Sequence, residues 1–365
     1  MILYITVMVV TLLLASRIEH VECEKDQWMQ AKSRRWIINR IMLAGIFAVL
    51  FFVSVFRIKT GNDYLTYIEH FHDVYCGNYV VTEIGFNIIV KAVYSLFDSE
   101  VYLLIFGIFA LGTILFSLDA MYKASKDFAF TFFLYMSLGL YFHSLNTVRY
   151  YLALSIVMMA LYKLVKDDYV GFIICVLVAS LFHKSVLVVL PLYMLAKINW
   201  KKWQLVLFGA FSLTGLIFSK QYLSLMLRLY PSYVNEPEYL IQGSFSIINI
   251  LRSILVITLA IICYEDSIKD NAENRFYLYL NVGALALYTC FTFVPFVSRI
   301  GYYLNVSQIF MVPAVINSIK DTKKRRTIRM ITIAIAIAYF AVFLYKAYGE
   351  TVKILPYSSW LYTAL

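Results

Sequence analysis

The sequence predicts an all-α polytopic membrane protein with about twelve transmembrane helices, and two kinds of observation lead to this. Of its 365 residues, 62% are hydrophobic and 15% are charged, and the mean hydropathy is +0.75. A soluble domain has about 45–50% apolar and about 25% charged residues. The apolar runs are roughly 15–22 residues long and do not alternate, which suits membrane helices better than the strands of a barrel. In lipid, a helix satisfies its own backbone hydrogen bonds.

Each apolar run with its charged flanks is expected to form one span. The first run, Met1–Ala15, has no basic segment before it and no small-residue cleavage site after it, so we predict a retained helix rather than a signal peptide. The sequence shows no internal repeat and no low-complexity linker that would divide it, so the whole chain, 1–365, is expected to form a single transmembrane domain. The expected spans lie near 1–16, 36–56, 101–121, 128–143, 147–163, 169–182, 184–196, 203–219, 246–263, 276–296, 299–318 and 330–347.

The distribution of Lys and Arg predicts the orientation of these spans. Loops rich in basic residues alternate with the spans, which places those loops in the cytoplasm and both termini outside. The external segments are then about 57–100 and 220–245, and the first should contain an amphipathic or re-entrant helix near 84–97. The basic loops account for the net charge of +10, so no nucleic-acid partner is expected. Their residues are Arg17, Lys25, Lys32, Arg34, Arg35, Lys123, Lys126, Lys163, Lys166, Lys197, Lys201, Lys202, Lys269, Arg275, Lys320, Lys323, Lys324, Arg325, Arg326 and Arg329.

Cysteine and metal-ligand patterns point away from a cofactor. An odd number of cysteines without CxxC spacing predicts neither a disulfide framework nor a zinc site. The sequence shows neither HxxxH nor DxD spacing, so we expect no metal. The cysteines are Cys23, Cys76, Cys175, Cys263 and Cys290.

A smaller set of basic residues falls on the predicted outer side. An arginine near the hydrocarbon costs about 2.5–3.5 kcal/mol at mid-helix, so arginines kept there usually face a cavity, a partner or a bound anion. Snorkelling to the head-groups, or an ion pair with Asp63 or Glu83, is the alternative explanation. The set includes Arg57, Lys59, Arg149, Lys184, Arg228, Arg252 and Arg299.

Five of these outer cations, namely Arg57, Lys59, Arg149, Lys184 and Arg299, occur in four polar clusters. Arg149 opens the fifth span, where a helix N-terminus favours an anion and a guanidinium fork suits phosphate oxygens. The clusters are Arg57…Gly61-Asn62-Asp63-Tyr64…Tyr67 with Glu83-Ile84-Gly85-Phe86, then Asn146…Arg149-Tyr150-Tyr151…Ala153, then Phe182-His183-Lys184-Ser185 before Pro191, and Pro295…Ser298-Arg299…Gly301-Tyr302-Tyr303.

In these clusters the sequence resembles the EpsG-like branch of the Wzy-type polysaccharide (O-antigen and exopolysaccharide) polymerases. The motifs follow the family order from about residue 57 to 303, although Tyr150 stands where the family commonly has Gln. The resemblance implies a GT-C-like architecture and a metal-independent, inverting glycosyl transfer. It places a multi-pass enzyme in the bacterial plasma (inner) membrane, with the active site on the outer or periplasmic side. The partners it implies are undecaprenyl-pyrophosphate-linked oligosaccharides, the lipid bilayer and, as an open question, a chain-length regulator.

This chemistry requires three kinds of residue. Cations must hold the pyrophosphate, a base must orient and deprotonate the acceptor hydroxyl, and aromatic groups must position the sugars. The pyrophosphate-binding candidates are Arg149 and Arg299, supported by Arg57 and Lys184. The catalytic candidates are His183, Asp63 and Glu83, of which His183 has an ordinary pKa close to working pH. The substrate-positioning candidates are Tyr64, Tyr67, Tyr150 and Tyr303.

Two other classes of protein remain open. A lipid-linked oligosaccharide flippase or other transporter would also have a dozen spans, but with its polar groups near the bilayer midplane and often with inverted repeats. A membrane acyltransferase of polysaccharide would also use His and Arg, usually on the side of its acyl donor. A ligase that moves finished glycan shares the donor of the polymerase, and the sequence barely separates the two.

Overall fold

The structure is a computed structural model that describes residues 1–20, 34–229, 246–294, 297–349 and 352–363. It is all-α over these residues, apart from one isolated β-bridge between Arg57 and Ser359. The chain divides into two compact units, Met1–Lys184 with Thr322–Leu365 (unit 1) and Ser185–Asp321 (unit 2). Each unit is described separately, and the single transmembrane domain over 1–365 stays a prediction.

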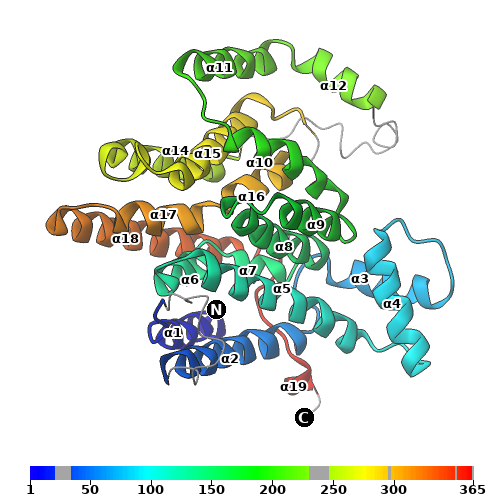
Figure 1. Cartoon of the computed structure of the whole chain (residues 1–365). Coiled ribbons are helices and arrows are strands. Elements are labelled where there is room, and N and C mark those ends of the chain that lie inside the picture. The colour runs from blue at the N-terminus through cyan, green and yellow to red at the C-terminus, as the bar shows by residue number, and fades with distance from the viewer. Residues whose placement is uncertain (21–33, 230–245, 295–296, 350–351, 364–365) are drawn as a thin grey trace. The chain divides into compact units, whose positions relative to one another are not determined.

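Unit 1 is built around two long apolar helices, α5 and α8. Helix α8 packs against α5 and α9, and α5 packs against α2 (Figure 1). The helices of unit 1 are α1 (Ile2–Ala15), α2 (Arg34–Val55), α3 (Tyr64–Tyr75), α4 (Ile84–Phe97), α5 (Tyr102–Ala124), α6 (Phe128–Ser137), α7 (Leu140–Ser144), α8 (Val148–Val165), α9 (Tyr169–Ser180), α18 (Thr322–Lys346) and α19 (Trp360–Thr363).

Unit 2 is arranged around α15, which packs against α10, α11, α14, α16 and α17. A Cβ at Gly301 would overlap the Tyr288 ring, so only glycine lets α16 approach α15 this closely. Its elements are η1 (Lys184–Val188, whose first residue belongs to unit 1), α10 (Val189–Lys197), α11 (Lys202–Ile217), α12 (Ser219–Leu229), α14 (Ile247–Ile262), the π-helical turn η3 (Tyr264–Ile268), α15 (Ala272–Cys290), α16 (Val297–Asn305) and α17 (Gln308–Asn317).

Several helices are long and apolar enough to cross a membrane. Helices α2, α5, α8 and α18 qualify by length and composition, and a fifth span results if α11 and α12, bent by 88°, are counted as one. Helices α1, α4, α6, α9 and α14 are shorter apolar helices of 10–17 residues. The chain is therefore an all-α protein with the helices of a multi-pass membrane protein, and the count of twelve spans stays a prediction.

Most predicted spans coincide with helices, but three contain breaks. The predicted span 128–143 divides into α6 and α7 at Gly139, which has φ +76° and lies against the Phe343 ring. The span 299–318 divides between Asn305 and Gln308, and 184–196 begins with a 3₁₀ turn. Helix α18 begins at Thr322 rather than near 330, because the basic residues before the apolar run are themselves good helix formers.

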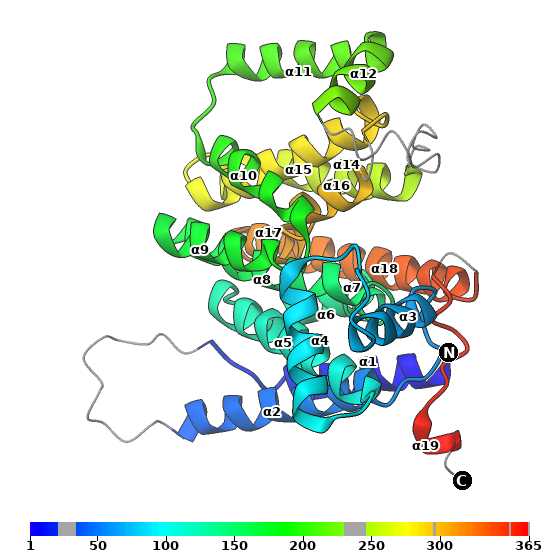
Figure 2. The same cartoon turned by 90° about the vertical axis from the view of Figure 1, so that its right-hand side faces the viewer.

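The helix expected near 84–97 is α4, but its exposed side is partly apolar. Phe86, Val90 and Val93 are buried on one face, whereas Ile84 and Ile88 are exposed. In Figure 2, α4 (cyan) runs across the direction of α2.

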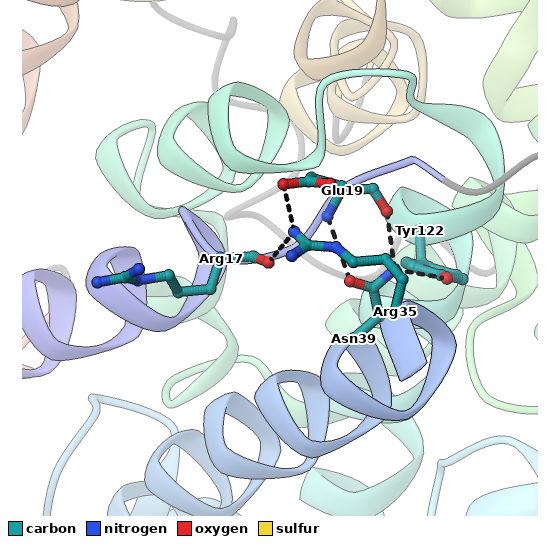
Figure 3. Close-up of polar contacts among 5 residues, drawn as sticks. All are labelled: Arg17, Glu19, Arg35, Asn39 and Tyr122. Atoms are coloured by element: carbon teal, nitrogen blue, oxygen red, sulfur yellow. Dashed lines mark hydrogen bonds and ion pairs between the residues drawn. The ribbon is translucent and has the colours of Figure 1, made fainter. Parts of the chain in front are cut away.

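Polar contacts in unit 1 join helix ends that the predicted topology places on the same side of the membrane. At one end, Arg35 forms an ion pair with Glu19 at 2.7 Å and donates to the Arg17 carbonyl, while Asn39 bonds Glu19 and the Tyr122 hydroxyl (Figure 3). The end of α1, the start of α2 and the end of α5 therefore meet at one place, as loops on one membrane side should. Which side faces the cytoplasm stays a prediction.

The C-terminal segment of unit 1 lies along the chain that leaves α2. The amides of Ile58 and Gly61 donate to the carbonyls of Ser358 and Lys353 at 3.0 and 2.8 Å, and the amide of Trp360 donates to the Phe56 carbonyl at 2.9 Å. These bonds fix the backbone from which the first polar cluster projects.

Candidate functional site

Arg149 and Glu83, which are 66 residues apart in the chain, form an ion pair at the start of α8. Nη1 of Arg149 lies 2.5 Å from Oε2 of Glu83, and the two side chains are 21% and 14% exposed. The guanidinium carbon lies 5.3 Å from the ring centre of Phe86 and 5.8 Å from that of Tyr67. The pair is thus largely covered by aromatic rings, which favours a cation over their faces. Pairing with Glu83, the alternative explanation for an outer arginine, is confirmed for Arg149.

Gly85 allows the start of α4 to reach the end of α9. Its amide donates to the Leu181 carbonyl at 2.9 Å, and a Cβ at this position would lie only 2.7 Å from the same oxygen. Oε1 of Glu83 also accepts from the backbone amide of Lys184 at 3.3 Å. One carboxylate therefore connects the N-terminus of α8 with the chain that follows α9.

Asp63 is held by the turn that precedes α8. Its amide donates to Oδ1 of Asn146 at 3.0 Å, and its carboxylate accepts from the Thr147 hydroxyl at 3.1 Å. Gly61, with φ +99°, makes the approach possible, because a Cβ there would lie 2.9 Å from Asn146 Cα and from the Leu145 carbonyl oxygen. The first and second sequence clusters are therefore in direct contact.

An open pocket of about 330 Å³ lies next to the ion pair. Most of its lining side chains are polar or charged. The lining comes from the end of α3, the α3–α4 loop, α4, the end of α9 and the first residue of η1. Glu83 and Lys184, two of the predicted site residues, belong to this lining. The lining residues are Val74, Asn78, Tyr79, Val80, Thr82, Glu83, Ile84, Asn87, Lys91, Ser180 and Lys184.

His183 lies next to this pocket in sequence but contacts a different residue. Its ring meets the ring of Tyr150 edge-on, with 5.3 Å between the centres. Tyr150 is 3% exposed. The neighbouring Lys184 contributes to the pocket lining, so the structure brings Lys184, rather than His183, to the pocket with Glu83.

Arg57 and the two tyrosines of the first cluster are core residues of unit 1. The Arg57 guanidinium lies over the Phe106 ring at 4.6 Å and donates to the Ser54 carbonyl. Tyr64 stacks on the same ring at 5.0 Å, and the Tyr67 hydroxyl accepts from the Arg149 amide at 3.4 Å. Arg57, Tyr64 and Tyr67 are all buried. Of the three, Tyr67 contacts Arg149 directly, whereas Arg57 and Tyr64 both pack on the Phe106 ring.

Burial and nearby charge shift the pKa values of two side chains on α3, His70 and Tyr67. The pKa of His70 is lowered, chiefly by burial and then by the positive charge of Arg149. The pKa of Tyr67 is raised, chiefly by burial. Both groups are therefore neutral near pH 7.

Arg299 and Tyr303 belong to unit 2, on α16. Tyr303 is fully buried; its hydroxyl lies 3.1 Å from the Ser185 hydroxyl, and its carbonyl accepts from the Tyr193 hydroxyl. Arg299 is half-buried. Pro295 of the fourth cluster and most of the predicted external segment 220–245 lie outside the described residues, as do Cys23, Lys25 and Lys32.

Sequence reasoning missed most of the pocket lining, including Tyr79, Asn87 and Lys91. Asn87 and Lys91 stand four residues apart on α4, one turn beyond Glu83, so they share its face of the helix. That spacing was visible in the sequence once a helix near 84–97 was expected. No sequence pattern pointed to Tyr79, because its place in the pocket lining depends on the conformation of the loop between α3 and α4. Over the described residues, no group of three or more His, Cys, Asp and Glu side chains is arranged to hold a metal ion.

The chain is thus an all-α protein with several helices long and apolar enough to cross a membrane, and its unit 1 has an open pocket whose lining includes Glu83, Lys91 and Lys184. The sequence model of the EpsG family matches residues 40–359. The chain therefore belongs to the EpsG family, which is linked to exopolysaccharide biosynthesis. The match begins within α2 and ends at Ser359, so it includes every predicted site residue. Neither the curated proteins nor the solved structures gave a match to the chain.

Proposed function

We propose that the protein polymerises lipid-linked oligosaccharide repeat units at the outer face of the bacterial plasma membrane. The donor is a growing glycan on undecaprenyl pyrophosphate, and the acceptor is the non-reducing sugar of a new lipid-linked repeat. Membership of the EpsG family supports this activity through its link to exopolysaccharide biosynthesis. Within this proposal the chain crosses the bilayer about twelve times.

The observation that carries the proposal is the Arg149–Glu83 pair beside the pocket. Arg149 has five N–H donors, and one nitrogen, Nη1, contacts Glu83. Within the described part of the chain, its buried Nε has no hydrogen-bond partner. Glu83 thus holds the guanidinium in place while donors remain for a second anion. Pyrophosphate oxygens match this fork, and Lys184 adds a second cation at the pocket.

The reaction needs no further co-reactant. The acceptor hydroxyl oxygen attacks the anomeric carbon of the donor sugar from the side opposite the pyrophosphate, which inverts the configuration. The bond between that carbon and the pyrophosphate oxygen breaks, and its electron pair leaves with undecaprenyl pyrophosphate. Arg149 and Lys184 stabilise the charge that develops on the leaving group.

The hydroxyl proton needs an acceptor, and the pocket favours Glu83. Glu83 lines the pocket, whereas the Asp63 carboxylate is bonded to Thr147 and the His183 ring meets Tyr150. A Glu83→Gln chain should lose turnover at every pH, while His183→Asn should keep more than a tenth of it. The reverse result would make His183 the base, as the unperturbed pKa of histidine in general suggested.

Arg299 is proposed to contact substrate, and the fully buried Tyr303 to shape that part of unit 2; each is tested by its own substitution. Arg299→Ala is expected to shorten or abolish the polymer, and Tyr303→Phe to leave it intact if the hydroxyl serves only its contact with Ser185. Arg57, Tyr64, Tyr67 and Tyr150 are proposed to act from the core, by shaping the site.

The decisive experiment compares two chemically similar arginines. Arg329 pairs with Asp127 at 3.0 Å and lies over the Phe130 ring at 4.6 Å, as Arg149 pairs with Glu83 and lies over Phe86. Arg149→Ala should abolish long glycan ladders while single lipid-linked repeats accumulate. Arg329→Ala, at the other predicted membrane side, should leave the ladders unchanged. Ladders of normal length in an Arg149→Ala chain present at wild-type amount would refute the polymerase proposal.

Orientation is tested by cysteine-accessibility labelling. Single cysteines at 63, 183 and 299 should react with an impermeant reagent from the outside. Reaction only from the cytoplasmic side would overturn the proposed topology. Activity on purified lipid-linked repeats is also expected to survive EDTA, and a loss restored by a divalent ion would point to a different class of transferase.

A further inference from the structure

The loop between α3 and α4 presents one tyrosine to solvent at the edge of the pocket. Gly77, with φ +78°, ends α3, and the Asn78 amide then donates back to the Asp73 carbonyl at 2.8 Å. Val80 is buried and anchors the loop, whereas Tyr79 is 89% exposed. Most of the Tyr79 side chain is therefore left for a ligand.

Helix α4 supplies polar groups to the same pocket. Ile84, Asn87 and Lys91 follow one another at spacings of three and four residues, so they form one stripe of the helix, and all three line the pocket. The Thr82 hydroxyl donates to Oδ1 of Asn87 at 2.6 Å. With its carbonyl oxygen engaged, Asn87 has its NH₂ group left as a donor.

An aromatic face beside amide and ammonium donors suits a saccharide. A pyranose ring has an apolar C–H face that packs on an aromatic ring, and hydroxyls on its rim that need hydrogen-bond partners. Small-ligand sites combine apolar surface with a few such polar groups, in pockets of about 300–1,000 Å³, and this pocket of about 330 Å³ falls in that range. Lipid tails would fit less well, because they would leave the pocket's charged and amide groups without partners.

We infer that Tyr79, Asn87 and Lys91 form a saccharide-binding subsite for the acceptor repeat unit. This inference rests on the proposed polymerase function and assigns the acceptor to the α3–α4 side of the pocket. Tyr79 packs on the sugar face, and Asn87 and Lys91 donate to its hydroxyls. The acceptor then lies next to Glu83, which accepts its proton. Tyr79 is a positioning residue that determines which sugars bind.

The test measures binding without turnover. The full-length protein in lipid nanodiscs is titrated by calorimetry with the free oligosaccharide repeat. This oligosaccharide is released by mild acid from the lipid-linked repeats of the strain that makes the polymer, so it carries neither lipid nor pyrophosphate. Tyr79→Ala should weaken binding about tenfold, as expected for one lost aromatic contact of about 1.4 kcal/mol. Tyr79→Phe keeps the ring and should stay within about twofold. The matched control is Tyr345→Ala, since Tyr345 on α18 is 82% exposed and lies outside the pocket lining.

Each outcome bears on one of the two proposals. Wild-type affinity in Tyr79→Ala, or no saccharide binding by the wild type, would overturn the subsite. A Tyr79→Ala chain that binds the free saccharide normally but loses activity on lipid-linked acceptors would place Tyr79 in contact with lipid, which also overturns it. Tyr79-dependent binding by a protein that makes no polymer would instead remove the polymerase function and keep the subsite.

Discussion

Replacing Arg149 and Glu83 by Met, singly and together, should reveal a coupling energy of about 1–2 kcal/mol in the free energy of unfolding. An exposed ion pair contributes about 0.2–1 kcal/mol, and a hydrogen bond to a charged group contributes about 1.5–3 kcal/mol. This pair is 2.5 Å long, with side chains 21% and 14% exposed, so its value should fall between those ranges. Arg149→Met alone should cost more than the coupling energy, because the largely buried Glu83 carboxylate loses its cation.

The coupling energy is measured from reversible unfolding in mixed micelles, with helix content as the signal. The bond from the Lys184 amide to Glu83 is lost in both chains that lack Glu83, so it cancels in the cycle. The Arg329–Asp127 pair is the control: Arg329 is 40% exposed and the distance is 3.0 Å, so its coupling should be about 0.5 kcal/mol. A coupling below about 0.3 kcal/mol for Arg149–Glu83, within the usual scatter of such cycles, would refute the view that this pair fixes α4 to α8.

Three further changes test the surroundings of the site. Gly85→Ala should destabilise the fold by about 1–3 kcal/mol through overpacking against the Leu181 carbonyl, which follows α9. Gly209→Ala, where nothing lies within 4 Å of the new Cβ, should be neutral or stabilising. Equal melting temperatures of these two variants would contradict this prediction. Arg57→Met removes a buried cation and should keep or raise the melting temperature; a lower melting temperature would contradict this. His70 has a lowered folded pKa, so stability is complete above the unfolded pKa of about 6.5 and falls as pH decreases towards the folded value; His70→Asn should flatten the melting temperature over that window, and an unchanged slope would count against it.

The sequence predicted the helices well because long apolar runs that do not alternate favour helices over strands. Helices α5 and α8 begin within a residue of the expected positions. The breaks were not predictable from hydropathy, because the apolar pattern continues through Gly139 while the backbone turns at φ +76°. The early start of α18 was missed because its first turns are basic, and a hydropathy boundary does not coincide with a helix boundary there.

Prediction of the site was limited by contacts between distant parts of the chain. The arginine at the start of α8 and the carboxylate before α4 were both expected at one site, but which residues pair depends on how α4 docks. The Thr147 contact of Asp63 spans 84 residues and leaves no local pattern. Burial of Tyr64 and Tyr67 was equally hidden, because interfacial and core tyrosines look alike in a sequence with 30 of them.

The discontinuity of unit 1 has a consequence for how the protein is made. Residues 1–184 leave the ribosome long before 322–365, which complete the same unit. Until then Asp127 lacks Arg329, and the backbone of Ile58 and Gly61 lacks the carbonyls of Ser358 and Lys353. We therefore expect the first polar cluster to take its final shape only after the segment from Lys353 to Trp360 has been synthesised. A ribosome stalled before residue 322 should hold the first helices in the membrane with this segment still open to protease.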